Sequence, residues 1–576
     1  MSSTVHPVLA HGRRLPNGWD VVALLCVFAA IAAVAHVTPQ TFRPIDAPEA
    51  VSVSLDPARL PEYALRTTLR MFAALGCSLL FTFTYAPLAA KSRRAGLVMI
   101  PLLDVLQSVP ILGFLSFTTV FFMGLFPGRV AGLELAAIFA IFTSQAWNMA
   151  FSLYQALTMV PRDLEEATQS FRLTSWQRFW RLDAPFGVPG LVWNTMLSMS
   201  GGWFFVVASE AITLGDKTWK LPGIGSYVAE ALERRDLGAV LWAIAAMLVV
   251  IVLYDQLLFR PLVAWSAKFR FEMTAGAVAA DPWVLQLLRR TAVLRRAGDA
   301  LADAVGAITR LPIGRPTGRA VAARRVSSGA ADAAFFALVA LVTLFAAWKL
   351  IAYIIGSHIG WNDLGEAVGL GFITLLRVVV LIALAALVWV PIGVWIGLRP
   401  DWARRIQVAA QFLAAFPANL LFPIFVVVIV RYHLNADIWL TPLMILGTQW
   451  YILFNVVAGA SAFPGDLQEA AKNFGVRGWL WWRRVMLPGI FPYFVTGAIT
   501  ASGGSWNAAI VAEVATWGDD KISAHGLGAY IAHATDAGDF PRIVLGVAVM
   551  SVFVLSFNRA LWRPLYAYAT RRLTLT

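Results

Sequence analysis

The sequence of 576 residues is 59% hydrophobic and only 14% charged, with a mean hydropathy of +0.69 and a net charge of +13. Soluble domains are usually about 45–50% apolar and about 25% charged. This composition excludes a soluble globular protein, a disordered chain and a disulfide-rich scaffold, and it predicts a polytopic protein that lies in a lipid bilayer. In such a protein the basic excess is typical of cytoplasmic loops, so we expect no nucleic-acid partner.

Twelve apolar runs are long enough to cross the hydrocarbon, because a transmembrane helix needs about 20 apolar residues. The runs of the first half are 21–37, 70–90, 96–125, 131–160, 190–214 and 238–259. Those of the second half are 333–356, 376–398, 405–431, 437–462, 493–515 and 541–562. The first run follows Arg13 and Arg14 without a small-residue cleavage site, so we expect it to be a retained signal-anchor helix.

Basic residues gather in the connections that follow even-numbered runs. They include Lys91, Arg93, Arg94, Arg172, Arg178, Arg181 and many residues of the long segment 262–331. The connection 38–64 after the first run is instead balanced by acidic residues. We therefore predict that the even connections and both ends of the chain are cytoplasmic, in the inner membrane of a bacterium.

The chain contains an internal duplication. The stretch 161–168 recurs at 464–471, and the same offset of 303 residues relates Trp203 to Trp506 and Glu210 to Glu513. Because six spans separate the copies, the halves face the same way and form a parallel repeat about an axis along the membrane normal. The predicted fold is all-α, with about 12 transmembrane helices in two parallel six-helix repeats. Its parts are a first module at 1–261, a basic cytoplasmic linker at 262–331 and a second module at 332–576. The linker is expected to be plainly solvated; the alternative is that its basic, partly apolar stretch 285–296 lies on the anionic cytoplasmic leaflet.

The loop after the fourth run of each half, 161–185 and 464–488, is long and polar. The second copy contains Glu469-Ala470-Ala471, then Gly475, and ends on Pro488. This pattern resembles the EAA loop in the permeases of ABC importers. The resemblance implies the type I importer permease fold, docking of the loop on a cytoplasmic ABC ATPase dimer, and ATP and Mg held by that partner rather than by this chain. The matched positions are Asp163, Glu166, Ala167, Arg172, Asp466, Glu469, Ala470, Ala471 and Gly475.

The local chemistry of these loops suits docking. Ala470 and Ala471 are strong helix formers with minimal side chains, so a partner surface can approach the backbone closely. Gly475 permits the positive φ of a turn between two short helices. The first copy has Thr168 and Arg172 at matching places. Because a positive φ is uncommon for residues other than Gly, we expect the first turn to adopt another geometry.

Residues outside the loops narrow the resemblance. They are Trp147, Trp203 with Glu210, Trp506 with Glu513, and the Gly-x-Gly turns at 223–225 and 526–528. Together they resemble the nitrate/sulfonate/taurine group of ABC permeases, here with two permease modules fused in one chain. The resemblance implies import of a small anion (nitrate, sulfonate, taurine or similar) that a periplasmic binding protein delivers.

The candidates for translocation or gating are Arg70, Arg377, Trp203, Glu210, Trp506 and Glu513. A charge at membrane depth is costly unless it faces a cavity or a partner. We therefore expect the glutamates either to act in gating or receptor docking, or to form a structural hydrogen bond that ties the following loop. The arginines are expected to open the second helix of each half. They either snorkel toward the outer face or pair with these glutamates, with attraction of an anion as the less favoured alternative. The tryptophans are expected to pack rather than to contact substrate. Asp104, matched by Gln411, breaks the symmetry and either caps a helix or faces water.

Some functions are disfavoured by what the sequence lacks. No Gly-x-x-x-x-Gly-Lys-Ser/Thr stretch occurs, so a P-loop for ATP is absent. Histidines and cysteines show no metal-ligand spacing, and we expect neither an enzyme nor a bound cofactor or metal. One alternative is an ion-coupled secondary transporter of six plus six helices, which would need no docking loop. A membrane-embedded scaffold or sensor would not need a matched Gly-x-Gly turn in both halves.

Overall fold

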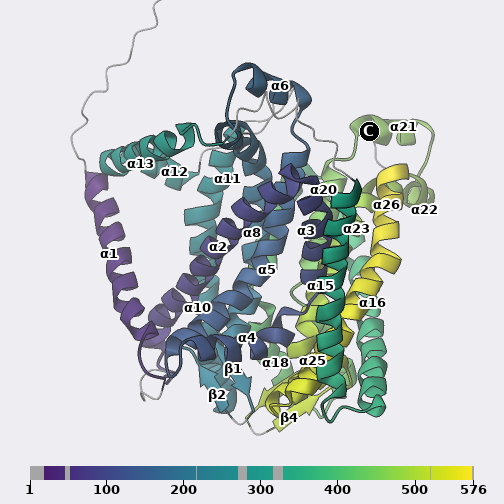
Figure 1. The fold of residues 1–576 in the computed structure, drawn as a ribbon. Helices are drawn as coiled ribbons and strands as arrows, with labels where there is room; N and C mark the ends of the chain where they lie inside the picture. The colour runs from purple at the N-terminus through teal and green to yellow at the C-terminus, as the bar shows by residue number, and fades with distance from the viewer. Residues whose placement is uncertain are drawn as a thin grey trace, which may run out of the picture. The chain divides into compact units, whose positions relative to one another are not determined.

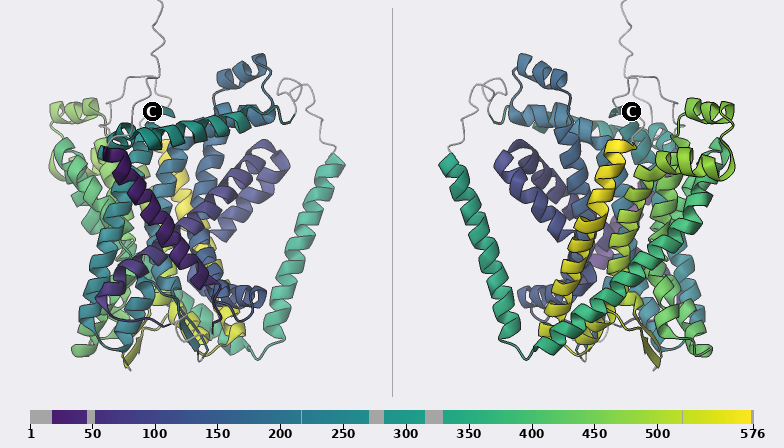
Figure 2. Two further views of the ribbon diagram at one scale, coloured as in Figure 1. Left: turned by 90° about the vertical axis from the view of Figure 1, so that its left-hand side faces the viewer. Right: turned by 90° about the vertical axis from the view of Figure 1, so that its right-hand side faces the viewer.

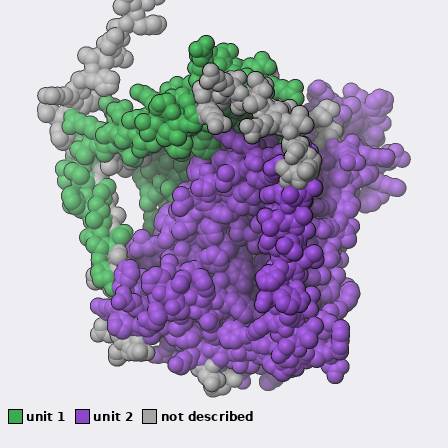
Figure 3. All heavy atoms as spheres, viewed as in Figure 1, with its two compact units in different colours: residues 1–39, 159–192, 253–325 green, residues 40–158, 193–252, 326–576 purple. Residues whose placement is uncertain are grey.

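The computed structural model describes residues 18–45, 52–215, 217–269, 282–314, 329–518 and 520–573 (Figure 1). They form two compact units (Figure 3). Unit 1 comprises the described residues within 1–39, 159–192 and 253–325, and unit 2 comprises those within 40–158, 193–252 and 326–576.

Unit 1 consists mainly of helices in its described residues. Its elements are most of α1 (Gly18–Thr41), α6 (Arg162–Ser170), α7 (Ser175–Arg178), the π-helical η2 (Phe179–Asp183), the start of α8 (Ala184–Ser209), η3 (Asp255–Phe259), α11 (Arg260–Ser266), η4 (Ala267–Phe269), α12 (Trp283–Arg290) and α13 (Ala292–Arg310).

Unit 2 holds most of the apolar helices of both halves. From the first half come η1 (Pro57–Arg59), α2 (Leu60–Lys91), α3 (Arg93–Leu106), α4 (Ile111–Leu125), α5 (Val130–Thr158), the rest of α8, β1 (Ala211–Leu214), β2 (Lys217–Lys220), α9 (Ile224–Glu233) and α10 (Leu237–Tyr254). From the second half come α15 (Gly329–Ile355), α16 (Trp361–Gly397), α17 (Pro400–Ala415), η5 (Ala418–Leu421), α18 (Phe422–Arg431), α19 (Ala436–Trp439), η6 (Thr441–Met444), α20 (Gln449–Ser461), α21 (Gly465–Asn473), α22 (Gly478–Trp481), η7 (Trp482–Met486), α23 (Leu487–Ala512), β3 (Val514–Trp517), β4 (Asp520–Ser523), α24 (Leu527–Asp536), α25 (Phe540–Phe557), η8 (Asn558–Trp562) and α26 (Arg563–Arg572).

The all-α, multi-span fold is confirmed, and the described residues show that some of the predicted runs are broken rather than continuous. Within the described ranges eight helices are long and apolar enough to cross a membrane, or up to eleven if each bent pair counts as one span. The third run of each half is broken, by 101° between α3 and α4 and by 80° between Ala409–Ala415 and Ala418–Arg431. Pro110 and Pro417 lie at these breaks. Proline lacks an N–H and disfavours helical geometry in the residue before it. A run of apolar residues does not reveal such a bend, because hydropathy carries no information on the direction of the helix axis.

The second helix of each half begins earlier than its apolar run. Helix α2 starts at Leu60 and α16 at Trp361, so Arg70 and Arg377 lie inside these helices and do not open them as predicted. A hydropathy window misses the added turns of α2 because they carry polar side chains such as Arg66 that pack inward. The consequence is that both arginines are held on rigid helical backbone.

Helix α15 has little contact with the rest of the described structure. None of its most apolar window is buried in the described structure, and Figure 2 shows it standing apart from the other helices of unit 2 along most of its length. A helix that is apolar all round is stable in this position only if lipid surrounds it.

Two β-hairpins interrupt the otherwise helical fold. Strand β1 pairs antiparallel with β2, and β3 with β4. The predicted runs 190–214 and 493–515 therefore end in strands rather than in helix. Within unit 2, the β3–β4 hairpin and α21 lie at opposite ends of α23 (Figure 1).

Small residues allow the helices of unit 2 to approach closely. A Cβ added at Gly497 of α23 would lie 2.7 Å from the Tyr451 carbonyl oxygen, and one at Gly393 of α16 would lie 2.8 Å from Val456. Such contacts are typical of helix packing in membranes, where hydrophobic burial between helices gives little driving force.

The linker predicted at 262–331 contains two amphipathic helices in its described part, α12 and α13. The C-terminal end of α13 contacts α7, because Trp176 donates from Nε1 to the Ile308 carbonyl oxygen at 2.9 Å and Gln177 donates to that of Arg310 at 2.8 Å. The linker is thus not a plainly solvated segment throughout. Residues 270–281 and 315–328 lie outside the described ranges.

Candidate docking loops and translocation site

The first polar loop folds as a helix, a tight turn and a short helix. After α6, the amides of Phe171, Arg172 and Leu173 donate to the carbonyl oxygens of Ala167, Gln169 and Thr168. Arg172 has φ +50°, in the left-handed region that residues other than Gly rarely adopt. Thr174 then caps α7 in a capping box with Gln177.

The second polar loop has the same turn. After α21, the amides of Phe474, Gly475 and Val476 donate to the carbonyl oxygens of Ala470, Lys472 and Ala471, and Gly475 has φ +63°. The prediction that Arg172 would force another geometry is therefore wrong. Three hydrogen bonds fix each turn, and together they outweigh a backbone cost of about 1–3 kcal/mol for a residue other than Gly.

The predicted docking residues differ in exposure. The side chains of Asp163, Glu166, Ala167, Arg172, Asp466 and Glu469 are exposed, as is Gly475. Ala471 and its counterpart Thr168 are buried, and Ala470 is partly buried, so the Ala-Ala pair packs mainly inside its own loop rather than offering bare backbone to a partner. Phe171 and Phe474, 77% and 85% exposed, occupy equivalent positions that sequence reasoning missed. Large exposed aromatics of this kind are frequent anchors of protein interfaces.

The first loop is braced more than the second. Arg178 pairs with Glu165 and lies 3.4 Å from Asp183, and Trp176 is held by α13. In the second loop the equivalent Trp479 is 73% exposed.

A buried ion cluster joins α2 to the end of α8. The guanidinium of Arg70 donates to Glu210 at 2.6 Å and to both carboxylate oxygens of Glu134, at 2.6 and 2.7 Å. A further bond reaches the Pro222 carbonyl oxygen at 3.0 Å. Arg70 and Glu210 are fully buried, and the expected pairing between them is present. Breaking a buried pair of this kind is strongly destabilising because one charge stays uncompensated.

Glu210 also holds the Gly-x-Gly turn. It accepts hydrogen bonds from the Thr67 hydroxyl at 2.7 Å and from the Gly225 amide at 2.6 Å. A Cβ at Gly223 would lie 2.3 Å from this carboxyl group, and one at Gly225 would lie 2.2 Å from the Val207 carbonyl oxygen. The glycines are therefore needed for close approach, and the glutamate ties the following loop.

The second half repeats this cluster with looser geometry. Arg377 lies 3.3 Å from Glu513 and 2.8 Å from Asp437, which is the counterpart of Glu134. Glu513 accepts from Thr374 at 2.9 Å and from the Ala529 amide at 3.0 Å. The second cluster differs at one further place, because His525 replaces Pro222 and its ring contacts Asp437 at 2.9 Å.

Each hairpin carries a clasp to the opposite half. The Gly215 amide donates to the carbonyl oxygen of Thr535 at 3.2 Å, and the Gly518 amide donates to that of Leu232 at 2.9 Å. The offset of 303 relates these bonds to each other, so the clasp is reciprocal. Both glycines have φ near +60°, which a tight two-residue hairpin turn requires.

A network of ion pairs near the surface connects the first hairpin to α9. Lys220 donates to Glu230 at 2.7 Å and to Glu233 at 2.6 Å. Partial burial would raise the pKa of Glu230, but the bonds from Lys220 and Arg234 outweigh it and hold that pKa below its usual value. Burial would lower the pKa of Lys220, and its two glutamate partners raise it on balance.

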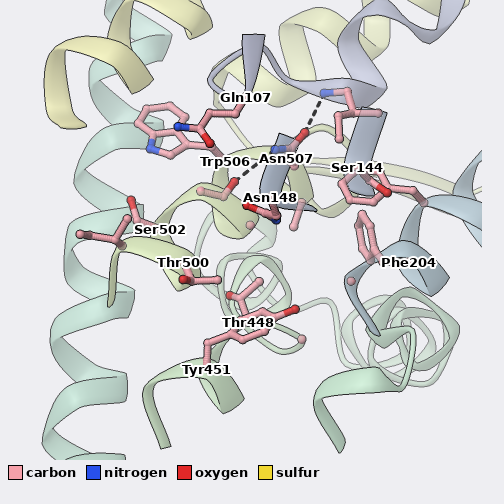
Figure 4. A pocket seen from close by; sticks show the side chains of 18 of the residues that line it. Gln107, Ser144, Asn148, Phe204, Thr448, Tyr451, Thr500, Ser502, Trp506 and Asn507 are labelled. Carbon is pink, nitrogen blue, oxygen red and sulfur yellow. Dashed lines mark hydrogen bonds between the residues drawn. The ribbon is translucent and has the colours of Figure 1, made fainter. Parts of the chain in front are cut away.

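A cavity of about 310 Å³ lies inside unit 2 between the two halves (Figure 4). Its walls come from α5, α8, α20, α23, the α25–η8 segment and both broken spans. The residues that line it include Gln107, Asn148, Phe204, Tyr451, Trp506 and Asn507, and none of the described lining residues is Asp, Glu, Lys, Arg or His. Of the predicted candidates, only Trp506 reaches the cavity. Trp203 is buried elsewhere, and Arg70, Arg377, Glu210 and Glu513 do not line it.

Cross-half hydrogen bonds hold the broken spans at this cavity. The Ile111 amide at the start of α4 donates to Asn507 Oδ1 at 2.7 Å. In the opposite direction, Asn419 donates to the Phe204 carbonyl oxygen at 3.1 Å. Since Phe204 is the counterpart of Asn507, each break is tied to the same place on the other half's long helix.

Asp104 forms a further tie with no counterpart. It pairs with Arg563 at the start of α26 and accepts from Gln107 at 2.8 Å. The expectation that Asp104 caps a helix or faces water is therefore replaced by an ion pair between the halves. The matching Gln411 contacts Met196 instead.

These features define a class of protein: a multi-span membrane protein whose two repeated halves enclose an uncharged cavity, as in transporters. The family model for the "binding-protein-dependent transport system inner membrane component" matches residues 80–260 and 389–563. The chain belongs to this family of transport permeases and carries its domain twice.

Individual relatives are more distant. The chain is 26% identical over 185 residues to the nitrate import permease protein NrtB of Leptolyngbya laminosa, covering 32% of this chain and 63% of that protein. It is 26% identical over 186 residues to the bicarbonate transport system permease protein CmpB of Synechococcus elongatus, covering 32% and 64%. It is 29% identical over 174 residues to the glycine betaine/carnitine transport permease protein GbuB of Listeria monocytogenes, covering 29% and 54%. The chain thus spans less than two thirds of the length of each.

Proposed function

We propose that the chain is the transmembrane permease of an ATP-driven importer, in which loops 161–185 and 464–488 dock on a separate cytoplasmic ATPase dimer. The observation that carries this proposal is the pair of loops with one turn geometry, each exposing a phenylalanine and acidic side chains. A docking surface of this kind has no use in an ion-coupled secondary transporter. The sequence of this chain contains no P-loop, so the ATPase would bind ATP and Mg and supply the energy for transport.

The proposed orientation places both loops and both termini on the cytoplasmic side of the inner membrane. Support comes from the basic residues of the even connections. In unit 2, α21 and the β3–β4 hairpin lie at opposite ends of α23 (Figure 1), so this orientation turns the hairpin toward a periplasmic binding protein.

The proposed substrate is a small anion such as nitrate, a sulfonate or taurine. Support comes from the nitrate and bicarbonate permeases among the relatives and from a cavity whose polar groups are hydroxyls, amides and indoles rather than carboxylates.

Reconstitution of the complex tests this function. The purified chain is placed in proteoliposomes with its ATPase and binding protein, and uptake of labelled nitrate and taurine is followed with and without ATP. We expect uptake only with ATP, and a loss of at least tenfold for Phe474→Ala, because interface anchors cost 2 kcal/mol or more when truncated. Tyr432→Ala, which removes an exposed aromatic from the C-terminal end of α18, serves as the control and should transport normally. Uptake driven by a proton gradient without ATP would refute the proposal in favour of a secondary transporter.

Labelling of a single cysteine tests the orientation. Asn473→Cys is introduced into a chain whose Cys26 and Cys77 are replaced by Ser, and intact cells are treated with a membrane-impermeant maleimide. We expect modification only after the cells are opened. Labelling in intact cells would reverse the proposed topology.

A further inference from the structure

Helix α13 of the linker is amphipathic, and its apolar face is uncovered in the part of the chain that the structure describes. Leu301, Val305 and Ile308 follow one another at steps of four and three residues, which places them on one side of the helix. These residues are 66%, 47% and 54% exposed. The exposed residues Asp299 and Asp303 lie on the opposite side. A continuous exposed apolar stripe of this kind marks a surface that binds a partner.

The beginning of α13 is fixed to the beginning of α1. The Val293 amide, in the first turn of α13, donates to Asp20 Oδ1 at 2.9 Å. A carboxylate of another helix thus takes the role of an N-cap side chain and meets the positive end of the helix dipole. Figure 1 shows α13 lying across α1 at this place. Because α1 is an apolar helix of 24 residues, long enough to cross the hydrocarbon, its beginning holds α13 at the level of a membrane surface.

The end of α13 is fixed to the first docking loop. Trp176 Nε1 donates to the Ile308 carbonyl oxygen at 2.9 Å, and Gln177 donates to that of Arg310 at 2.8 Å. The last carbonyl groups of a helix lack their usual partners within it, and the loop supplies donors for two of them. Gln177 also accepts from the Thr174 amide at 3.1 Å. One side chain therefore joins α13 to the capping box of α7.

The second docking loop has no such brace among its described residues. The offset of 303 places Trp479 and Leu480 at the positions of Trp176 and Gln177. Both side chains are exposed, and a leucine side chain has no hydrogen-bond donor. An effect that passes through α13 therefore reaches one of the two loops only.

The composition of the linker helices indicates what covers the apolar stripe. The stretch 283–310 carries five arginines and two aspartates, a net charge of +3. Trp19 of α1 and Trp283 of α12 are about half exposed, and tryptophan is enriched where a protein meets the boundary between lipid and water. An apolar stripe accompanied by arginines and exposed tryptophans fits the surface of an anionic bilayer.

We propose that α13 lies with its apolar stripe on the anionic lipids of the cytoplasmic leaflet and transmits this contact to the first docking loop. The connection runs from α1 through α13 to Trp176 and Gln177, and from there to the turn at Arg172. One docking loop then becomes more stable as the content of anionic lipid rises, while the other does not respond. This inference rests on the proposed cytoplasmic orientation of the loops.

Quenching of a fluorophore by nitroxide lipids tests the membrane contact. Leu301→Cys is introduced into a chain whose Cys26 and Cys77 are replaced by Ser, labelled with bimane, and placed in nanodiscs of phosphatidylglycerol and phosphatidylcholine. Part of the phosphatidylcholine carries a nitroxide near the headgroup end of an acyl chain. We expect quenching to be about fivefold stronger for Leu301→Cys than for Asp303→Cys, the matched control on the opposite side, because only the stripe reaches the acyl chains. Equal quenching at the two positions, or none at either, would overturn the proposal.

Hydrogen–deuterium exchange of the full chain tests the transmission. The reporters are the amides of Leu173 and Val476, which close the turns of the first and second loops. With phosphatidylglycerol in the nanodiscs, we expect Leu173 to exchange about fivefold more slowly than in phosphatidylcholine alone, and Val476 to change less than twofold. Gln177→Leu, which gives the first loop the residue of the second, should remove this lipid dependence. Gln169→Leu is the matched control and should retain it, because no described hydrogen bond joins the Gln169 side chain to α13.

A second variant covers the case in which Gln177→Leu disturbs the loop by itself. Val305→Asp places a charge in the apolar stripe and leaves the bonds between α13 and the loop intact, so it should also remove the lipid dependence. A lipid effect of equal size on both loops, no lipid effect, or an effect that persists in Val305→Asp would contradict the proposal. Both measurements use the chain without ATPase, so ATP-dependent uptake combined with a negative result here would remove only this inference. Labelling of Asn473→Cys in intact cells would instead refute the orientation on which it rests.

Discussion

The left-handed turns of the two polar loops predict opposite effects of two substitutions. A side chain added at Gly475 would meet nothing within 4 Å, so Gly475→Ala changes only the cost of holding φ at +63°. That cost is about 1 kcal/mol, or roughly a fivefold increase in the population of the opened turn. In the first loop, where Arg172 already bears this cost at φ +50°, Arg172→Gly should shift the equilibrium about as far in the opposite direction.

Hydrogen–deuterium exchange of the purified protein measures both changes. The reporters are the amides of Val476 and Leu173, which close the two turns onto Ala471 and Thr168. We expect Val476 to exchange about fivefold faster in Gly475→Ala and Leu173 about fivefold slower in Arg172→Gly. Gly465→Ala is the control, because Gly465 lies at the first position of α21 with open space around it and no positive φ. Faster exchange of Leu173 in Arg172→Gly, or no change in Gly475→Ala, would show that the left-handed residue does not limit the stability of these turns.

Three further outcomes follow from the buried contacts. Glu210→Gln should lower the thermal unfolding midpoint of the purified chain more than Glu513→Gln, since the arginine contact is 2.6 Å in the first cluster and 3.3 Å in the second; an equal loss would contradict this ranking. Gly225→Ala should prevent stable folding, judged by gel filtration in detergent, because its Cβ would lie 2.2 Å from a backbone oxygen, while Gly76→Ala, with nothing within 4 Å, should be tolerated. The folded-state pKa of Glu230 is depressed, so its contribution to stability is present above the ordinary carboxyl pKa and is lost as the pH falls through the depressed value. Glu230→Gln should accordingly flatten the acid side of the stability profile, and an unchanged profile would exclude this pair as its source.

The sequence predicted the membrane class, the duplication and the short helices of the two polar loops, because each leaves a local signal. Apolar length marks a span, and a repeated motif at a fixed offset marks a module. The two hairpins also have a signal in the sequence. Gly215-Asp216 and Gly518-Asp519 are two-residue sequences typical of tight hairpin turns, but flanking strands of four residues are too short to show alternation.

The conformation at Arg172 was missed because intrinsic preference is a weak term. A residue in the left-handed region costs about as much free energy as one hydrogen bond contributes, and the turn has three hydrogen bonds. The broken spans were missed for a different reason, since Pro110 and Pro417 lie within runs whose hydropathy stays high. Proline was the available signal there.

The cavity could not be predicted because no local pattern encodes it. Gln107 and Trp506 are separated by hundreds of residues and line the same space only once the helices have packed. Equivalent positions such as Asn148 and Tyr451 were aligned by the offset of 303, but only the structure shows that both line one space.

The reciprocal clasp between the hairpins has a mechanical consequence. The turn of each hairpin is bonded to a helix of the opposite half, through Gly215 to Thr535 and through Gly518 to Leu232. A force applied to either hairpin is therefore shared at once by both halves, and neither bond can be strained alone without moving the helix that carries the other half's Gly-x-Gly turn. A protein that binds only one of the two hairpins would therefore displace both halves together.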